Sequence, residues 1–382
     1  MCIAYSMSLT MTLGSLERNR AAVIRAQELA EGIDDIDLQV HLLWSQWAVE
    51  TNSGDYVTAL VTAQRLAEVS QRGSDATRLL GDRYLGTSLL YAGRLDEARE
   101  RLQRVIDRYV APKDGHHAEL FIYDQRLLAR STSARVLCLL GYVDRASAEA
   151  RLCFEEASAG GAGIGSCRLL QDGVWPVALI TGDLVTAARA TATMIDWATT
   201  IDAPLWKMVG NCWNGKLLIE RGEFEQGVEL VSQAVEACEG TGWLRGYAEI
   251  LGHLAEGLAG LGKLDAAHDA IERAIDRAAH SGEVWHQPEL MRIKGEILLQ
   301  WSARTQTAEA EDCFRKASEL ARAQGALFWE LRIALSLARV YMTQGRADGA
   351  RQLLASVYER FTEGFAAPGL RAAKALLDEL PG

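Results

Sequence analysis

The sequence predicts an all-α protein in which about eight helical hairpins stack into a right-handed α-α superhelix, closed by a C-terminal capping helix. Three observations predict this fold class. A glycine-containing turn motif recurs about every 40 residues. Apolar and small residues flank each motif at helical spacings of three and four. Strand-like alternation of Val, Ile or Thr is almost absent. Such a period is typical of helical solenoids, so we expect residues 1–382 to form one solenoid domain.

The repeated unit is clearest in "GDRYLGTSLLYAGRLDEARERL", from Gly81 to Leu102. Its central Gly93 is expected to end the first helix, because a residue without a Cβ adopts a left-handed cap at little cost. From Gly54 onward the turn glycines are 39 to 48 residues apart, except for one gap of 83 residues, which is two periods. Turns are expected near Gly14, Gly54, Gly93, Gly141, Gly182, Gly222, Gly262, Thr305 and Gly345, with a cap over residues 368–380.

The prolines agree with this division. Pro112, Pro204, Pro288 and Pro368 fall between units or near helix starts, where a missing N–H costs little. Pro176 lies inside the first helix of its unit, and we expect it to kink or shorten that helix.

Composition excludes several classes of protein. Lys and Arg number 40 against 51 Asp and Glu, and the net charge of −11 disfavours a nucleic-acid-binding surface over the whole chain. The seven cysteines are odd in number and form no Cys-x-x-Cys pair, so we expect packed, reduced thiols. The N-terminus lacks the basic segment of a signal peptide, and no apolar run approaches the length of a membrane span. We therefore expect a cytoplasmic protein.

Two units carry the residue pattern of the tetratricopeptide (TPR) repeat. The large, small, turn and packing positions are occupied by Leu85, Gly86, Leu89, Gly93, Leu95, Ala98 and Leu102, and again by Leu254, Ala255, Leu258, Gly262, Leu264, Ala267 and Ile271. The chain therefore resembles TPR proteins, although its units are longer than the usual length of about 34 residues.

Most of the chain also resembles a narrower group. The matching segments are "LLGDRYLGTSLLYAGRLDEARERLQRVIDRYVAP", "YDQRLLARSTSARVLCLLGYVDRA", "PVALITGDLVTAAR", "PELMRIKGEILL", "FRKASELARAQGALFWELRIALSLARVY" and "GRADGARQLLASVYERFTEGFAAPGLRAAKALLDEL". They are similar to the C-terminal helical-repeat region of bacterial STAND-type ATPase transcriptional regulators and nucleotide cyclases. The "FTEGF" loop before a short helix is the most specific feature. The resemblance implies a sensor or scaffold arm whose partner is an ATPase domain.

The catalytic parts of that group are not expected in these 382 residues. No Gly-Lys-Ser or Gly-Lys-Thr of a phosphate-binding loop occurs, and no winged-helix segment precedes the repeats. The residues before Gly14 look like the tail of a first helix whose beginning is absent, which is compatible with the C-terminal part of a longer protein.

Candidate binding residues follow from the TPR register. Positions two, five, nine and twelve of each first helix are expected to line a concave groove. Together with two charged residues at one helix start, the candidates are Arg83, Thr87, Asp124, Arg126, Ser131, Arg135, Lys216, Glu249, Glu256, Glu289, Arg292, Glu296, Arg332 and Arg339. Along the groove, the side chains are basic and polar in the N-terminal half, acidic over residues 249–296 and basic again in the last unit. This pattern of charge suits a peptide, a partner helix or a small charged effector. A solvated face without a dedicated ligand is the alternative.

Two further sets of residues allow two interpretations each. Near the beginnings of first helices, a group of tryptophans is expected either to form a binding edge or to staple adjacent units: Trp206, Trp285 and Trp329. Core packing is expected for Trp44, Trp175 and Trp213. The charged residues Asp82, Arg83, Asp124 and Arg126 are expected to form either an inter-repeat ion pair or a recognition patch.

These observations predict a non-enzymatic module that binds a protein, a peptide or an effector. Neither a converging set of acid, base and nucleophile nor a metal-ligand spacing is present, so we expect no catalytic residue, no metal and no cofactor. Candidate partners are a protein or peptide segment, an ATPase domain of a longer regulator, and a small effector. Direct contact with nucleic acid or membrane is not expected. The alternative function is a structural oligomerisation scaffold without a separate ligand.

Overall fold

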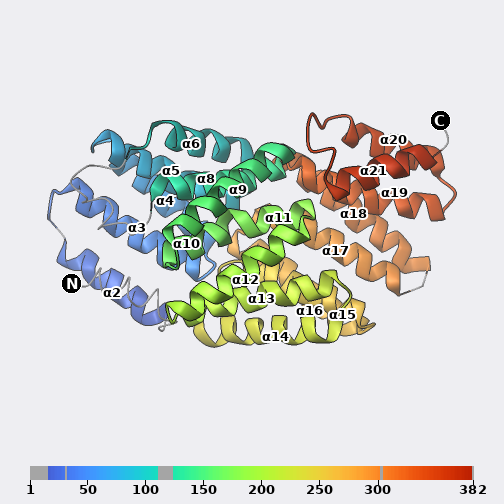
Figure 1. The fold of residues 1–382 in the computed structure, drawn as a ribbon, viewed down its shortest axis with the longest axis horizontal. Helices are drawn as coiled ribbons and strands as arrows, with labels where there is room; N and C mark the ends of the chain where they lie inside the picture. Colours follow the sequence, from blue (N-terminus) through green and yellow to red (C-terminus); the bar gives the residue numbers. More distant parts are fainter. Residues whose placement is uncertain (1–15, 31, 111–123, 302–303, 381–382) are drawn as a thin grey trace.

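The computed structural model describes residues 16–30, 32–110, 124–301 and 304–380, and within these ranges every regular element is a helix (Figure 1). The helices follow one another as antiparallel pairs. The first helices of the pairs are α3 (Ile36–Asn52), α5 (Asp75–Tyr91), α8 (Gln125–Leu139), the broken segment α10 (Ile164–Leu169), η1 (Leu170–Val174) and α11 (Trp175–Thr181), then α13 (Pro204–Glu220), α15 (Tyr247–Gly260), α17 (Gln287–Gln300) and α19 (Leu327–Thr343).

Each first helix packs against the second helix of its pair. The second helices are α4 (Tyr56–Ser70), α6 (Leu95–Arg108), α9 (Val143–Gly160), α12 (Leu184–Thr200), α14 (Phe224–Thr241), α16 (Leu264–Ser281), α18 (Arg304–Gln324) and α20 (Ala347–Tyr358). A half-unit, α2 (Leu16–Leu29), precedes the pairs, and a short 3-10 turn, η2 (Val284–His286), leads into α17. The capping helix α21 (Pro368–Glu379) packs on α19 and α20. The predicted all-α solenoid with its C-terminal cap is therefore confirmed.

The turns within pairs have a common geometry. The glycines at positions 54, 93, 141, 182, 222, 262 and 345 all have positive φ, between 66° and 91°. Thr305, near which a turn is expected, lies in the first turn of α18, and residues 302–303 before that helix lie outside the described residues. The turn expected near Gly14, like Pro112, lies outside the described residues.

Pro176 breaks its helix as predicted. The chain passes from α10 through the π-helical turn η1 and restarts in α11, with Pro176 in the first turn of α11. A proline has no N–H, and its ring collides with the carbonyl group four residues earlier in an α-helix. The wider π turn relieves both problems, and turns of this kind are frequent at functional sites.

The solenoid winds far enough for its C-terminal half to contact its N-terminal half. We call these contacts the seam, which joins residues 52–57 to residues 244–282 and residues 141–145 to residues 361–364. The helix α19 contacts α8, and the loop of residues 361–364 contacts residues 141–145. Figure 1 shows the C-terminal helices α19 to α21 together at one end of the molecule. One apolar core accordingly contains residues from both ends of the chain, while a second lies in the middle units.

The "FTEGF" loop forms one part of the seam. The Gly364 N–H donates to Asp144 Oδ2 at 2.9 Å, and Arg145 Nε donates to Glu363 Oε2 at 2.9 Å. Gly364 has φ +81°, and a Cβ there would lie 2.4 Å from the Val143 Cβ. Only glycine therefore fits this close approach.

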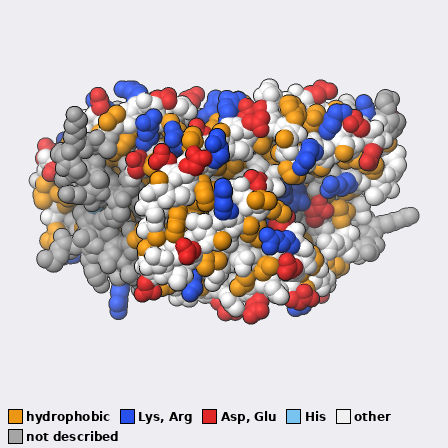
Figure 2. All heavy atoms as spheres, in the orientation of Figure 1, with side chains coloured by type: hydrophobic (Ala, Val, Ile, Leu, Met, Phe, Trp, Pro, Cys, Tyr) orange, Lys and Arg blue, Asp and Glu red, His pale blue; other side chains and the backbone are white. Residues whose placement is uncertain are grey.

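Acidic and basic side chains are interspersed on the face shown in Figure 2, without a large patch of one sign. Within the described ranges, no helix is both long enough and apolar enough to cross a bilayer. The described cysteines are mostly buried and none is in a disulfide, as expected.

Candidate functional site

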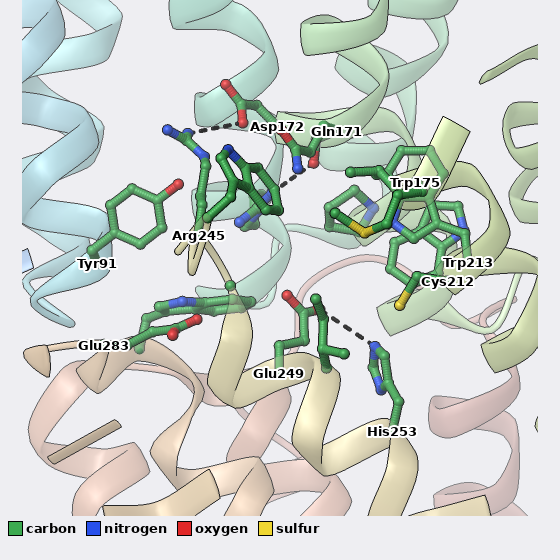
Figure 3. Close-up of a pocket in the computed structure, with 18 residues that line it drawn as sticks. Tyr91, Gln171, Asp172, Trp175, Cys212, Trp213, Arg245, Glu249, His253 and Glu283 are labelled. Atoms are coloured by element: carbon green, nitrogen blue, oxygen red, sulfur yellow. Dashed lines mark hydrogen bonds and ion pairs between the residues drawn. The ribbon is translucent and has the colours of Figure 1, made fainter. Parts of the chain in front are cut away.

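The first helices surround a cavity of about 60 Å³ inside the superhelix, which we call the central cavity (Figure 3). Its walls come from α5, α8, η1, α11, α13 and α15 and from two connecting loops. The residues that define it are Tyr91, Arg135, Gln171, Asp172, Trp175, Pro176, Met208, Val209, Cys212, Trp213, Trp243, Arg245, Gly246, Glu249, Ile250, His253, Glu283 and Trp285.

The π turn directs polar groups into this cavity. Asp172 Oδ1 accepts a hydrogen bond from Arg245 Nη2 at 3.1 Å, and the Gln171 carbonyl oxygen accepts one from Arg135 Nη2 at 2.8 Å. A Cβ on Gly173 would lie 2.4 Å from the Ser131 carbonyl oxygen, so the turn needs glycine to pack against α8. The break at Pro176 thus builds part of the site.

Arginines outnumber ionised carboxylates around Asp172. Burial alone raises the pKa of Asp172, but the guanidinium groups of Arg245, Arg168, Arg135 and Arg83 outweigh burial and hold the pKa below its usual value. Asp172 is therefore ionised at neutral pH and is surrounded by four cations.

Two other titratable groups of the wall, Glu283 and His253, do little to balance that charge. Burial, with a smaller contribution from Glu249, raises the pKa of Glu283 to about 8, so Glu283 is mostly protonated at pH 7. Burial lowers the pKa of His253 well below its usual value, so this imidazole is neutral. Its Nε2 lies 3.9 Å from Glu249 Oε1.

Several buried donors in the wall have no acceptor among the described residues. They are Arg135 Nε and the indole N–H groups of Trp175, Trp243 and Trp285. The Trp175 ring stacks on Trp213, with centroids 4.8 Å apart and an angle of 6° between the planes. Figure 3 shows this aromatic pair at one end of the cavity and Tyr91, Arg245 and Asp172 at the other. The cavity therefore combines a flat apolar end with a cationic, donor-rich end.

A second cluster of charged residues lies farther along the inner face, beside a cavity of about 260 Å³. We call it the ion-pair network: Lys216, Glu220, Glu256, Glu289, Arg292, Glu296 and Arg332. Burial alone raises the pKa of Glu289, but Arg292 and Arg332, each 2.8 Å away, lower it far below its usual value. Lys216 Nζ lies 2.5 Å from Glu256 and 2.6 Å from Glu220. The cations of this network are neutralised by protein carboxylates.

The residues predicted to line the concave groove lie in four different places. Arg135 and Glu249 line the central cavity, and Lys216, Glu256, Glu289, Arg292, Glu296 and Arg332 belong to the ion-pair network. Arg83, Thr87 and Ser131 are buried in the packed interior. Asp124, Arg126 and Arg339 are exposed, and none of these three lines either cavity. Most of the concave face is thus filled by its own side chains, and it is not a solvated groove.

The charged quartet near the starts of α5 and α8 does not form the expected inter-repeat ion pair. Asp82 pairs with Arg101 at 2.7 Å, within its own hairpin. Asp124 accepts the Leu127 N–H and caps α8. The Arg83 guanidinium lies 4.4 Å from the centroid of the Tyr84 ring and is buried. Asp82, Arg83 and Asp124 therefore have separate local roles, and Arg126 is exposed.

The tryptophans near the helix beginnings are staples. Trp206, Trp285 and Trp329 are at most 2% exposed, and Trp329 Nε1 donates to the Trp285 carbonyl oxygen at 3.0 Å across two units. The binding-edge interpretation is wrong for this rim, since an exposed edge needs exposed rings. The core packing of Trp44, Trp175 and Trp213 is confirmed.

The TPR register missed several residues of the central cavity. Asp172 lies in the π turn, and Trp243 and Arg245 lie in the loop between α14 and α15, so none occupies a regular concave position. The misplaced Pro176 was the available signal, because it marked the one unit whose first helix departs from the repeat.

We compared the chain with known protein families, curated proteins and solved structures. No protein-family model and no curated protein sequence matches the chain. A Rap protein complexed with Competence and Sporulation Factor is similar in structure, with a TM-score of 0.61 and 12% identity over 99% of this chain and 98% of that one.

Two other solved structures are also similar. The hetero-tetramer Cut9–Hcn1 of the APC/C gives a TM-score of 0.56 with 13% identity, over 95% of this chain and 59% of that one. A STAND protein with a tetratricopeptide repeat sensor from Pyrococcus horikoshii gives 0.47 with 14% identity, over 96% and 54%. With the helix pairs described above, the first two similarities identify the fold of this chain as a TPR-like helical solenoid.

Proposed function

We propose that this protein is a non-enzymatic regulatory module whose central cavity binds an effector, and that it is the sensor arm of a bacterial signal-transduction or transcriptional regulator. The observation that carries the proposal is the central cavity itself, whose wall residues Arg135, Trp175, Trp243 and Trp285 each have a buried donor without a hydrogen-bond partner among the described residues. Interiors normally pair such groups. The similarity of the fold to a Rap protein complexed with Competence and Sporulation Factor supports a regulatory role.

Binding in the cavity can be transmitted through the loop of residues 242–246. Arg245 reaches into the cavity and pairs with Asp172. On the outer side of the same loop, the Leu244 N–H donates to the Asn52 carbonyl oxygen at 2.7 Å, and the Gly246 N–H donates to Tyr56 Oη at 2.8 Å. The loop therefore links the cavity wall to the seam. An effector that binds the closed and opened seam with different affinity will shift the population between them.

The chemistry of the wall supports a binding role over an enzymatic one. Burial raises the pKa of the Cys212 thiol far above its usual value, which leaves little thiolate for nucleophilic attack. His253 is neutral but has a pKa too low for a general base at pH 7. Glu283 is protonated and Asp172 is held in an ion pair. None of these four groups is therefore suited to nucleophilic or general-base catalysis at pH 7, and this supports a binding role.

The test is a titration that does not presume the chemistry of the effector. Low-molecular-mass and peptide fractions from cells that make the protein are added while tryptophan emission and the melting temperature are recorded. Trp175, Trp213, Trp243 and Trp285 line the cavity, so an occupant alters their emission. We expect saturable changes in emission and a higher melting temperature.

Two variants localise the response. Val209→Phe places a larger side chain in the cavity wall and should abolish it. Val185→Phe, at a position 82% exposed, is the matched control and should leave it intact. A response that survives Val209→Phe, or no response from any fraction, would contradict the proposal. In that second case, dissociation of an oligomer on dilution in light scattering would favour the structural scaffold.

A further inference from the structure

We propose that the central cavity takes a carboxylate carried on a small, flat apolar body, with Arg135 as its principal partner. This inference rests on the proposed effector site and names the chemical class of its ligand. It follows from three properties of the wall, which are the balance of hydrogen-bond donors and acceptors, the placement of the counter-charges, and the shape of the space.

Among the buried polar atoms of the wall that have no hydrogen-bond partner in the described residues, four are donors and one, Glu283 Oε1, is a carboxyl oxygen. Arg135 Nε and the indole N–H groups of Trp175, Trp243 and Trp285 have no acceptor among the described residues. Of the carboxylates in the wall, Asp172 is engaged by Arg245 at 3.1 Å. An unmade hydrogen bond from a buried donor is costly, so a ligand that supplies acceptor oxygens is favoured over one that supplies donors.

The arginines of the cavity differ in their counter-charges. Arg245 faces the carboxylate of Asp172, whereas Arg135 donates to a neutral group, the Gln171 carbonyl oxygen at 2.8 Å. Arg135 is 6% exposed, and no described carboxylate lies within ion-pair distance of it. A buried guanidinium is strongly stabilised by a carboxylate, which matches the planar fork of its donors. Of the two arginines that line the cavity, Arg135 is thus the one without a described carboxylate at ion-pair distance, although Glu249 also lines the wall.

This charge count favours a monoanion over a phosphate. A phosphate group carries close to two negative charges at neutral pH and is best held by more than one cation. The second arginine of the wall, Arg245, already has Asp172 as its partner. A carboxylate, with one negative charge and two oxygens in one plane, fits the single available partner better.

The space around Arg135 is flat and small. The Arg135 guanidinium lies 5.2 Å from the centroid of the Trp285 ring. The stacked pair of Trp175 and Trp213 forms one end of the cavity. A volume of about 60 Å³ holds roughly four to six waters at 10–15 Å³ each. A cavity of this volume suits a small ring or a short chain and not a helix of a partner protein.

The experiment uses benzoate as the probe and benzamide as its uncharged counterpart of similar shape. Isothermal titration and tryptophan emission are measured with the full chain at pH 7, with inorganic phosphate as a third probe. We expect benzoate to bind saturably at millimolar concentrations, at least about tenfold more tightly than benzamide or phosphate.

Variants assign the charge. Arg135→Gln should lower the affinity for benzoate about tenfold or more, and Arg135→Lys, which keeps the charge and loses the fork, should give an intermediate loss. Arg221→Gln, which removes an exposed arginine outside the cavity, should bind benzoate like the parent protein. Circular dichroism establishes that each variant is folded, and the comparison of benzoate with benzamide in the parent protein needs no variant.

Three results would overturn the proposal. Equal affinities for benzoate and benzamide would mean that the donors of the cavity wall do not require a negative charge on the ligand. Tighter binding of phosphate would assign the site to a different anion. No binding of benzoate, or binding unaffected by Arg135→Gln, would remove Arg135 from the site. In each case, a cell fraction whose binding is blocked by Val209→Phe would still support the proposed function, so the failure of the two proposals can be told apart.

Discussion

The central cavity and the ion-pair network both lie on the inner face of the superhelix, but they differ in how many carboxylates surround their cations. In the network, Arg292 contacts three carboxylates and Lys216 contacts two. In the cavity, Arg135 contacts none among the described residues. All three cations are at least nine-tenths buried. Burial and charge are therefore shared by the two regions, and what separates them is whether the protein supplies the counter-charge.

This difference distinguishes a structural role from a binding role. A buried cation with protein carboxylates around it holds repeats together, and removing one partner leaves an uncompensated charge. A buried cation without a protein carboxylate adds little to the folded state by itself and is available to a ligand. Substitutions in the two regions should consequently have different effects on stability.

The largest effect is expected for Glu289→Gln. This change removes the carboxylate that Arg292 and Arg332 both contact and should lower the free energy of unfolding by about 3–5 kcal/mol. Urea denaturation at pH 7 measures it, with the exposed Glu319→Gln as the control. Because its folded-state pKa is lowered, Glu289 stabilises the parent protein above its unfolded-state pKa, and this stabilisation is lost as the pH falls through the folded-state value. A loss below about 1 kcal/mol would place the network among weak surface pairs.

Glu283 in the cavity should show the opposite dependence on pH. Its pKa is raised to about 8, so the folded state keeps a proton that the unfolded state loses near its ordinary value. Its contribution to stability is present below that unfolded-state pKa and falls by up to about 1.4 kcal/mol per pH unit until the pH passes 8. We expect Glu283→Gln to melt close to the parent protein at pH 5 and at a higher temperature at pH 8.5. Parallel melting curves at all pH values would refute this assignment.

The turn at Gly262, outside both regions, shows how much a strained backbone alone should lower the free energy of unfolding. Gly262 has φ +71°, and a Cβ there would meet nothing within 4 Å, so Gly262→Val should strain the backbone without a clash. We expect a loss of about 1 kcal/mol or slightly more, seen as a lower midpoint in urea denaturation. The exposed Val185→Phe is a control for surface substitution. An unchanged midpoint would mean that the left-handed turn tolerates a β-branched residue.

The smallest effect on stability is expected for Arg135→Gln. The variant loses the hydrogen bond to Gln171 but also removes a buried charge without a carboxylate partner, and these changes oppose each other. We expect a change of less than about 1 kcal/mol in the free energy of unfolding, by urea denaturation at pH 7. A loss as large as that of Glu289→Gln would remove the distinction between the two regions.

The sequence predicts the fold well because its signals are local. Turn glycines such as Gly93 and Gly262, and the small and large residues around them, each act within a single hairpin. The same register placed Arg135, Lys216 and Glu289 on the inner face. It did not predict the central cavity, since Arg245 lies in a loop and stands 5.5 Å from the Tyr91 ring only because the superhelix winds that far. The pitch of the stack is the sum of many small rotations between units, and no single residue encodes it.

The seam changes how the chain should fold. An open solenoid behaves as a one-dimensional array, in which a unit can be lost from one end with little effect beyond its neighbour. Here Glu363 and Gly364 bond to Arg145 and Asp144, more than 200 residues away, and Leu327 and Phe361 pack near Gly141. Removal of the last hairpin would therefore expose α8 and α9 in the first half of the molecule. The repeats of the first half and the last repeats thus depend on each other for stability. Contacts of such long sequence separation should make folding slow and cooperative across the whole chain.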